Sequence, residues 1–294
     1  MIHCIVVGYH KWREVEALVG QLASLEMDDV WIHFADNLGD SEIIKRVKVY
    51  PNVTYYSFRN IGFGNAANHI LRSNQWPEDS LFVIMNDDIL FKGNGFGHLV
   101  NTYNKISERQ DNVGVVSPSF VASRSSEDSS RYFQLSKFNQ GIYTEMIFGP
   151  AACWMVNYTF LKKVGGFYPG FFMYGEDLEL LNRASYYGFK HYLVHDSLVL
   201  HDFDYPPKDE SLRLMKETNL IAAHYLDLNS RSKGHVFATK GLIVSFSRVQ
   251  FTRFKFIFLG YIQFFLKSAT LRRAKMNHKS PQDFRYIQPL SSNI

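Results

Sequence analysis

The first part of the chain alternates short apolar runs with stretches of helical periodicity, and this alternation limits the fold more than any other feature. Strands that alternate with helices build βαβ units, whose crossovers place the strands parallel in one sheet. We therefore predict an α/β fold with a mostly parallel sheet. The strand-like runs lie at 2–9, 30–37, 53–58, 80–89 and 113–121, and helices are predicted at 14–25, from residue 64, and at 96–107.

The rest of the chain divides into a continuation of this pattern and a tail. With 294 residues, 46% of them hydrophobic, the chain can bury one large core and carry an appendage. The composition turns aromatic and basic after Asn229, so we predict one α/β domain over 1–229 and a tail over 230–294. Before the boundary, strands are predicted at 145–156 and 191–200, an aromatic segment at 167–177, and helices at 178–187 and 211–225.

Cysteine usage and the N-terminus bear on the compartment. Cys4 and Cys153 lie far apart and form no CxxC pair, which indicates neither a disulfide framework nor a cysteine metal site. The N-terminus enters a strand without the basic, apolar and small-residue order of a signal peptide. We expect the chain to remain in a reducing cytoplasm.

An apolar strand ends on Asn86-Asp87-Asp88. Ligands of open α/β sheets bind at the carboxyl ends of the strands. Carboxylate oxygens suit Mg²⁺ or Mn²⁺, and such a cation can bridge a diphosphate and help it depart as a leaving group. Asn and Asp also form ordinary turns, so the motif alone leaves a metal site and a turn both open.

A second acidic pair, Glu176-Asp177, follows the aromatic run 171–174 and opens a helix. Acids at a helix N-terminus are favoured by capping and by the helix dipole, which is a purely structural explanation. The aromatic run could equally be core. Alternatively it could exclude water, raise the pKa of a carboxylate toward that of a useful base, and stack on a sugar.

The segment from Asn60 to Asn68, NIGFGNAAN, follows a strand and opens a helix. Its Gly62, Gly64 and Ala67 satisfy the dinucleotide fingerprint GxGxxA, so an oxidoreductase that binds NAD or a flavin is the first alternative. The segment follows the third strand and not the first, which argues against a bound dinucleotide. Further on, His201 ends the last predicted strand and is either an exposed polar residue or a ligand.

Taken in order, these segments resemble bacterial glycosyltransferase family 2, in particular the rhamnosyltransferase-like and galactofuranosyltransferase-like members that build surface polysaccharides. The resemblance spans residues 2–201 and is longest over GPAACWMVNYTFLKKVGGFYPGFFMYGEDLELLNRASYYGFKHYLVHDSLVLH. It implies a GT-A fold, with a Rossmann-like nucleotide-binding sheet and an acceptor-side half. It also implies transfer of a sugar with inversion at the anomeric carbon.

The resemblance also implies roles for single residues. Asp177 would be the general base with Glu176 as its neighbour, and Asp88 and His201 would be ligands of Mn²⁺ or Mg²⁺. This chain has Asp87 where these members commonly have proline, and Glu179 where many have aspartate. The expected nucleotide-sugar contacts are Asp36, Asn37, Asn60, Gly62, Asn68, Asn86 and Asp87.

The same resemblance implies the substrates. The donor would be dTDP-rhamnose or a UDP-hexose such as UDP-galactofuranose. The acceptor would be a hydroxyl of a lipid-linked or growing glycan of an O-antigen, a capsule or a related polysaccharide. A binding protein for carbohydrate or nucleotide that has lost turnover is the non-catalytic alternative, and the presence of Asp177 argues against it.

The tail carries most of the positive charge. Residues 231–294 hold 12 Lys and Arg and one acid, whereas residues 1–230 hold 20 basic and 27 acidic residues. Phenylalanines alternate with Arg and Lys over 246–275, and the longest uncharged run, 256–266, has 11 residues. Because a membrane-spanning helix needs about 20 apolar residues, we predict a helix that lies on the anionic inner face of the cell membrane.

Two other fates of this tail stay open. Its aromatic residues could pack on the catalytic domain, or basic and aromatic residues together could bind single-stranded nucleic acid. We expect no nucleic-acid partner, and we expect the tail to hold the chain peripherally at the membrane, close to a lipid-linked acceptor.

Overall fold

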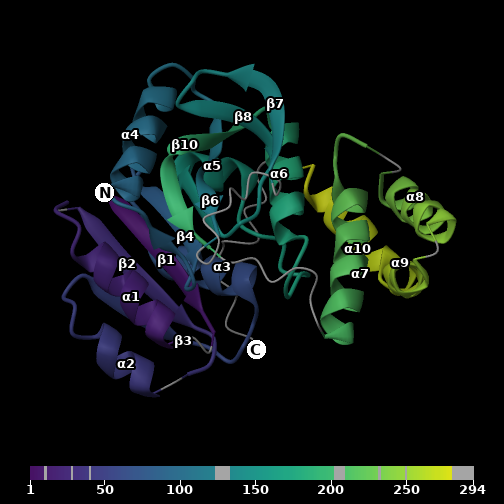
Figure 1. Cartoon of the computed structure of the whole chain (residues 1–294), viewed down its shortest axis with the longest axis horizontal. Coiled ribbons are helices and arrows are strands. Elements are labelled where there is room, and N and C mark those ends of the chain that lie inside the picture. The colour runs from purple at the N-terminus through teal and green to yellow at the C-terminus, as the bar shows by residue number, and fades with distance from the viewer. Residues whose placement is uncertain are drawn as a thin grey trace.

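The computed structural model describes residues 1–9, 12–27, 29–39, 41–122, 133–201, 209–230, 233–248 and 250–279. Within these residues, ten strands form one sheet in the order β3-β2-β1-β4-β9-β6-β10-β8-β7, and β5 pairs with β10 (Figure 1). The predicted α/β fold with its Rossmann-like half is confirmed. Its first strands are β1 (Ile2–Gly8), β2 (Val30–Asp36), β3 (Val53–Ser57) and β4 (Leu81–Asn86).

These four strands are parallel and form the half of the sheet that the alternating pattern predicts. β1 pairs with β2 on one side and with β4 on the other, so that Gly8 lies opposite Asp36 and Val7 lies opposite Asn86. Every residue of β1 is buried, because helices cover both faces of a parallel sheet. The carboxyl ends of β1, β2 and β4 therefore meet at one edge.

The other half of the sheet is mixed. β6 and β10 are parallel, while β9 runs antiparallel to both β4 and β6 and joins the two halves. β8 is antiparallel to β10 and β7 to β8. These strands are β5 (Leu90–Phe91), β6 (Val113–Val121), β7 (Gln134–Asn139), β8 (Tyr143–Phe148), β9 (Cys153–Asn157) and β10 (Lys190–Leu200).

The single strand predicted at 145–156 is wrong, because this run forms two strands at different places in the sheet. β8 pairs with β10, whereas β9 lies between β4 and β6. Gly149 and Pro150 separate them, and proline has no N–H for a ladder hydrogen bond. The interruption carries the chain from one side of β10 to the other.

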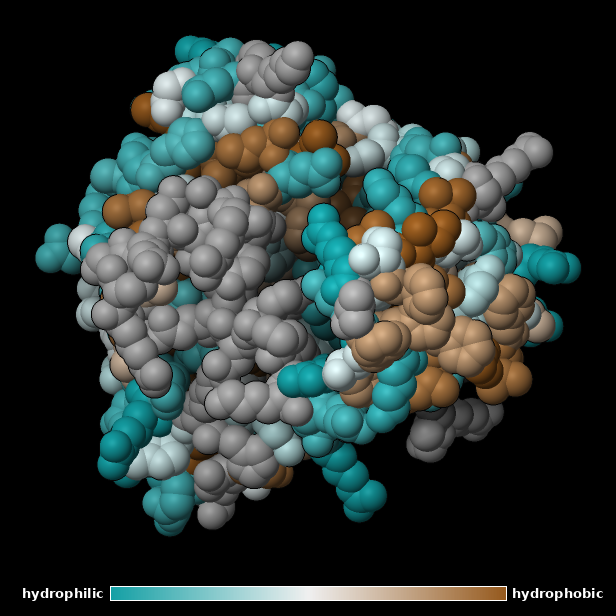
Figure 2. Space-filling model, turned by 45° about the vertical axis from the view of Figure 1, so that its right-hand side comes forward, coloured by the Kyte–Doolittle hydropathy of each residue, from teal (hydrophilic) through white to brown (hydrophobic). Residues whose placement is uncertain are grey.

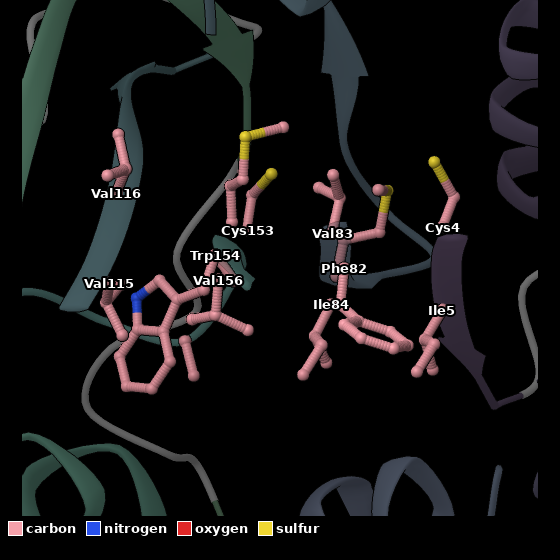
Figure 3. Packing of buried hydrophobic residues seen from close by; sticks show 14 of the residues in the cluster. Cys4, Ile5, Phe82, Val83, Ile84, Val115, Val116, Cys153, Trp154 and Val156 are labelled. Carbon is pink, nitrogen blue, oxygen red and sulfur yellow. The ribbon is translucent and has the colours of Figure 1, made fainter. Parts of the chain in front are cut away.

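The core packs across the sheet. Figure 3 shows Cys4 and Cys153 pointing to one side of it and Phe82, Ile84 and Trp154 to the other. All five side chains are buried, and both cysteines are free thiols. The helices around the sheet are α1 (Trp12–Ala23), α2 (Ser41–Val47), α3 (Phe63–Ser73), α4 (Gly95–Ser107), α5 (Tyr158–Val164) and α6 (Glu176–Tyr186).

The chain ends in a helical unit beside α6 (Figure 1). Tyr168 and Phe171, from the loop before α6, belong to a second apolar core. The other buried members of this core come from the four helices of the unit. The predicted helical tail is present, although residues 231, 232, 249 and 280–294 of it lie outside the described residues. The helices are α7 (Glu210–Leu226), α8 (Lys233–Ser247), α9 (Phe251–Leu266) and α10 (Ser268–Asn277).

None of the helices in the described ranges has by itself both the length and the apolar character to cross a bilayer. α9 and α10 meet both criteria only as a pair, and they are bent by 69° where they join. The boundary predicted at residues 229 and 230 stays a prediction, and α7, which precedes it, shares its core with α8, α9 and α10.

Candidate functional site

The first acidic motif lies at the edge where β1, β2 and β4 end. Asp87 is buried, and its Oδ2 accepts a hydrogen bond of 3.0 Å from the backbone N–H of Tyr9. A Cβ at Gly8 would lie 3.0 Å from the same oxygen. Asp87 therefore shapes the loop after β1, and the glycine is needed so that strand and carboxylate can approach.

The next residue, Asp88, faces the end of β10. Its Oδ1 lies 3.3 Å from Nε2 of His201. His201 is buried, and its backbone N–H donates to the carbonyl of Val121 at the end of β6. The structure thus brings together the two residues that the sequence predicts as metal ligands, from segments more than a hundred residues apart.

This pair has the chemistry and spacing of two metal ligands. Two ligands at right angles and about 2.1 Å from a cation are about 3 Å apart, which compares with 3.3 Å here. Among the described residues, no group of three or more His, Cys, Asp or Glu is arranged to hold a metal. Asp88 and His201 would thus be the residues that hold a divalent cation, and their metal role stays a prediction.

Asp36, the expected nucleobase contact, is buried at the end of β2. Its Oδ1 accepts from the backbone N–H of Leu38 at 2.8 Å, and its Oδ2 accepts from the Tyr55 hydroxyl at 2.6 Å. Asn37 is also buried, and its Oδ1 accepts from the backbone of Ile61 at 3.4 Å. These contacts hold the turn after β2 against β3 and the start of the 60–68 segment.

The segment 60–68 supports the loop that leads to Glu176. Asn68 is buried, and its side-chain amide exchanges two hydrogen bonds of 2.7 and 2.9 Å with the backbone of Phe167. Asn60 Oδ1 accepts from the N–H of Gly62 at 3.3 Å. Gly62 has a φ of 86°, and a Cβ there would lie 2.0 Å from the carbonyl oxygen of Phe172. These contacts are structural, and the nucleotide contacts of Asn60, Gly62 and Asn68 stay predictions.

The second acidic motif forms the first turn of α6. Gly175 precedes it with a φ of 87°, and Tyr174 has a φ of 64°, which is rare for a residue with a side chain. Asn219 of α7 donates to the carbonyl of Met173 at 2.8 Å and so holds this strained turn from the other side. The loop before α6 is therefore fixed between α3 and α7.

The two acids of this motif differ in access to solvent. Glu176 is buried, and its Oε2 has no hydrogen-bond partner among the described residues. Asp177 is partly exposed, and its Oδ1 accepts from the N–H of Leu178 at 2.7 Å. Of the two residues, Asp177 is therefore the less buried.

Burial changes the proton affinity of both acids. It raises the pKa of Glu176, and the neighbouring Asp177 raises it further. Burial also raises the pKa of Asp177, although hydrogen bonds from the backbone around Leu178 and Ala151 oppose that rise. A carboxylate with a raised pKa is a better base, and this acidic pair has the electrostatics expected of a catalytic one.

Two alanines join the acidic motifs. The carbonyl of Ala152 accepts from the N–H of Asn86 at 3.0 Å, while the backbone of Ala151 opposes the rise in the pKa of the Asp177 carboxyl. The motifs at the end of β4 and at the start of α6 thus lie on either side of one short segment.

Sequence reasoning missed three contributors to this site, namely Tyr55, the backbone of Ala151 and Ala152, and Asn219. In the sequence, Tyr55 is an ordinary residue of a predicted strand. Asn219 is one polar residue among others in a predicted helix. The alanines act through main-chain atoms, which carry no side-chain signal. Only the packing of β9 next to β4 brings this segment to the acids.

Comparison with known proteins supports the fold. No protein-family model matches the chain, and no curated protein does. Among solved structures, a mannosyltransferase from Pyrobaculum calidifontis, determined with GDP-Man and Mn²⁺, is similar with a TM-score of 0.58 and 13% identity, over 90% of this chain and 86% of that one.

Two further structures agree with this result. TarS from S. aureus gives a TM-score of 0.52 at 12% identity, over 81% of this chain but 45% of that chain. A mycobacterial protein gives 0.52 at 14% identity, over 76% of this chain and 74% of that one. The chain therefore has the fold of glycosyltransferases of the GT-A type.

Proposed function

We propose that this chain transfers a sugar from a nucleotide-diphosphate sugar to an acceptor hydroxyl, with inversion at the anomeric carbon. The observation that carries the proposal is the position of Asp177. Asp177 is half-buried, its carboxyl has a raised pKa, and it lies one short segment away from the acidic end of β4. The glycosyltransferase fold and the resemblance of residues 2–201 to glycosyltransferase family 2 support the same reaction.

In the proposed reaction, Asp177 takes the proton of the acceptor hydroxyl. The acceptor oxygen forms a bond to the anomeric carbon from one face, while the bond from that carbon to the diphosphate breaks on the other. The nucleoside diphosphate leaves with the electron pair of the broken bond. Positioning of the two substrates and stabilisation of the developing charge would supply most of the rate.

A divalent cation, Mn²⁺ or Mg²⁺, would be held by Asp88 and His201. When bound, it would neutralise charge on the diphosphate. Asp87 would support this region through Tyr9 of the β1 loop. The similar mannosyltransferase was determined with Mn²⁺, which agrees with this assignment.

The family resemblance favours dTDP-rhamnose or a UDP-hexose such as UDP-galactofuranose as donor. It favours a lipid-linked or growing surface glycan, as in O-antigen or capsule synthesis, as acceptor. The similar mannosyltransferase was determined with GDP-Man. A donor screen should therefore cover UDP, dTDP and GDP sugars.

The oxidoreductase alternative is less well supported. Its fingerprint glycines follow β3, whereas a dinucleotide fingerprint belongs after the first strand. Gly62 is explained by its close approach to Phe172. The non-catalytic alternative would show donor binding without product.

The test begins with a thermal-shift screen of nucleotide sugars with Mn²⁺, because a ligand that binds the folded state raises its melting temperature. The donor found is then used with Asp177→Asn. We expect transfer to fall by about 10²- to 10⁴-fold, as for loss of a general base, with the thermal shift by donor unchanged. Full turnover by this variant would refute the mechanism.

Asp88→Ala serves as the second arm of this test. It should abolish the effect of Mn²⁺ on the donor-induced shift, whereas Asp196→Ala, at an exposed acid on β10, the strand that precedes His201, should leave it unchanged. A metal response that survives Asp88→Ala would remove Asp88 from the ligand set.

We also propose that the tail docks on anionic membrane. Helix α9 has two apolar faces. Phe256 and Phe264 are buried, whereas Phe251, Phe258 and Phe265 are 65%, 48% and 51% exposed at the spacing of one helical face. α8 adds Ile243 and Phe246, which are also exposed.

The exposed rings form a continuous surface. Phe246 lies 6.2 Å from Phe254, which lies 6.2 Å from Phe258. Figure 2 shows apolar surface gathered over the C-terminal helices. Residues 231–279 contain no acid, and the exposed basic residues of this unit include Lys240, Arg248, Arg253, Lys255, Lys267, Arg272 and Arg273.

This combination favours a lipid surface as the partner. Phenylalanines can enter the headgroup boundary while Lys and Arg meet anionic lipid. Such docking would hold the chain peripherally on the cytoplasmic face of the membrane, beside a lipid-linked acceptor.

A further inference from the structure

A buried charged cluster joins the end of α10 to the helix that carries Asp177. Glu179, Arg183 and His278 are 1%, 3% and 4% exposed. Glu179 lies in the first turn of α6, two residues after Asp177, and Arg183 lies one turn further on. His278 follows the last residue of α10. The proposed sugar transfer gives no direct role to any of the three.

Arg183 fixes α6 against the start of the loop before it. Its guanidinium makes two hydrogen bonds of 2.8 Å to the two carboxylate oxygens of Glu179. It also donates to the carbonyl of Gly166 at 2.7 Å and to the carbonyl of Val164. A planar fork with four directed bonds sets an orientation as well as a distance.

His278 adds the C-terminal unit to this cluster. Its Nδ1 lies 3.2 Å from Oε1 of Glu179. Its carbonyl accepts from the hydroxyl of Tyr187, just beyond the end of α6. Its ring also meets the edge of Tyr168, with the centroids 5.7 Å apart, in the loop before α6. One residue thus contacts both ends of α6 and the loop that precedes it.

The cluster is balanced in charge. Burial lowers the pKa of His278 to about 4 although Glu179 opposes the shift, so the imidazole is neutral at neutral pH. Burial alone would raise the pKa of Glu179, but Arg183 outweighs it and the pKa is lowered. One negative and one positive charge therefore remain.

A buried ion pair is weak evidence for stability, because the cost of removing both charges from water offsets their attraction. Well-packed apolar side chains could hold α6 to α10 equally firmly. What the cluster adds is a fixed direction, because Arg183 bonds α6 to the carbonyls of Val164 and Gly166, and Tyr187 bonds to the carbonyl of His278 beyond α10.

We propose that Glu179, Arg183 and His278 are positioning residues that set the first turn of α6, and with it Asp177, from the C-terminal helical unit. The inference rests on the proposed function for its catalytic consequence only. Independently of that function, we infer that the end of α10 holds the first turn of α6 in place.

The test compares His278→Ala with His278→Asn in the full chain, where the asparagine amide nitrogen takes the place of Nδ1. Met276→Ala, an exposed change on α10, is the matched control. For His278→Ala we expect kcat to fall about tenfold or more with the donor KM little changed, because small misplacements of catalytic groups have large effects. Asparagine should restore most of kcat.

Hydrogen exchange measured without substrate separates this inference from the proposed function. In His278→Ala, the amides of residues 175–180 should exchange faster, while those of β1 and β4 should not change. Unchanged exchange at 175–180 would overturn the proposal, as would faster exchange throughout the chain, which would show general destabilisation. Absence of sugar transfer in the unsubstituted chain would affect the proposed function and leave the exchange result standing.

Discussion

The two acids at the start of α6 differ in burial. Glu176 is buried and Asp177 is partly exposed, although both stand in one helical turn. The helix dipole favours both charges, but burial disfavours them and prevails, because the pKa of each is raised. Asp177, the less buried of the two, is the one that we propose as the proton acceptor.

Stability should depend on pH through Glu176. In the unfolded chain a glutamate loses its proton near pH 4.3, whereas in the folded chain its pKa is raised. Between these values the folded state binds the extra proton, so the free energy of unfolding falls as pH rises, by up to about 1.4 kcal/mol per pH unit. Below about pH 4.3, Glu176 is protonated in both the folded and the unfolded chain. The stability that is lost at higher pH is fully present there.

Glu176→Gln removes this titration and keeps the shape of the protonated acid. As pH rises from about 5 to about 8, we expect the free energy of unfolding to fall less in the variant than in the original chain. Chemical denaturation at several pH values measures this difference. Glu78→Gln, at an exposed glutamate, is the control. Identical pH dependence of the original chain and Glu176→Gln would contradict the burial argument.

The loop before α6 is clamped by elements on two sides. α3 approaches it through Gly62 and Asn68, and α7 approaches it through Asn219. The positive φ angles of Tyr174 and Gly175 persist because these neighbours hold the chain there. The glycine-rich segment therefore has a structural purpose besides any contact with a nucleotide.

Gly62→Ala tests this clamp, with Gly188→Ala as a matched control. Both glycines have a positive φ, but only at Gly62 would a Cβ collide with backbone, whereas nothing lies within 4 Å at Gly188. We expect Gly188→Ala to cost about 1–2 kcal/mol. Gly62→Ala should cost about 1–3 kcal/mol more, because overpacking adds to the strain. If denaturant unfolding showed the same loss of stability in both variants, the loop before α6 would be able to move away from residue 62 without cost.

The molecule as a whole has a catalytic part and a basic helical unit that meet at α6 and the loop before it. The apolar core of that unit includes Tyr168 and Phe171 of this loop, and its outer face is apolar and exposed. The aromatic residues of the tail therefore fall into two groups. Some pack inward, and the others remain available to a partner.

Membrane docking can be tested with a triple variant, Phe251→Ser, Phe258→Ser and Phe265→Ser. Binding to vesicles that contain anionic lipid should fall at least about tenfold, since burial of a phenylalanine contributes about 1.5–3 kcal/mol. Val49→Ser and Ile147→Ser, at exposed apolar residues of the catalytic part, should bind as before. Unchanged sedimentation of the triple variant, or its conversion from a dimer to a monomer without vesicles, would argue against a lipid partner.

Local patterns were sufficient for much of this molecule. Most strands and helices of the first half, the acidic end of β4, the acidic start of α6 and the helical tail follow from periodicity and charge, which depend on residues close in the chain, although α2 and β5 were not predicted. The parallel orientation of β1, β2, β3 and β4 follows as well, because βαβ crossovers place strands parallel, whereas their order in the sheet was not predicted. The pairing of Asp88 with His201 was predicted through the family resemblance, and the structure brings the two together.

Long-range packing determined the rest. Nothing near Gly149 indicates that β9 inserts between β4 and β6, where it brings Ala151 and Ala152 to the two acidic motifs. The hydrogen bond from Tyr55 to Asp36 and the contact of His278 with Glu179 join residues whose separation in the chain carries no periodic signal. Such contacts depend on which surfaces bury each other best in the complete chain, and this is a property of the folded whole that no local window of sequence contains.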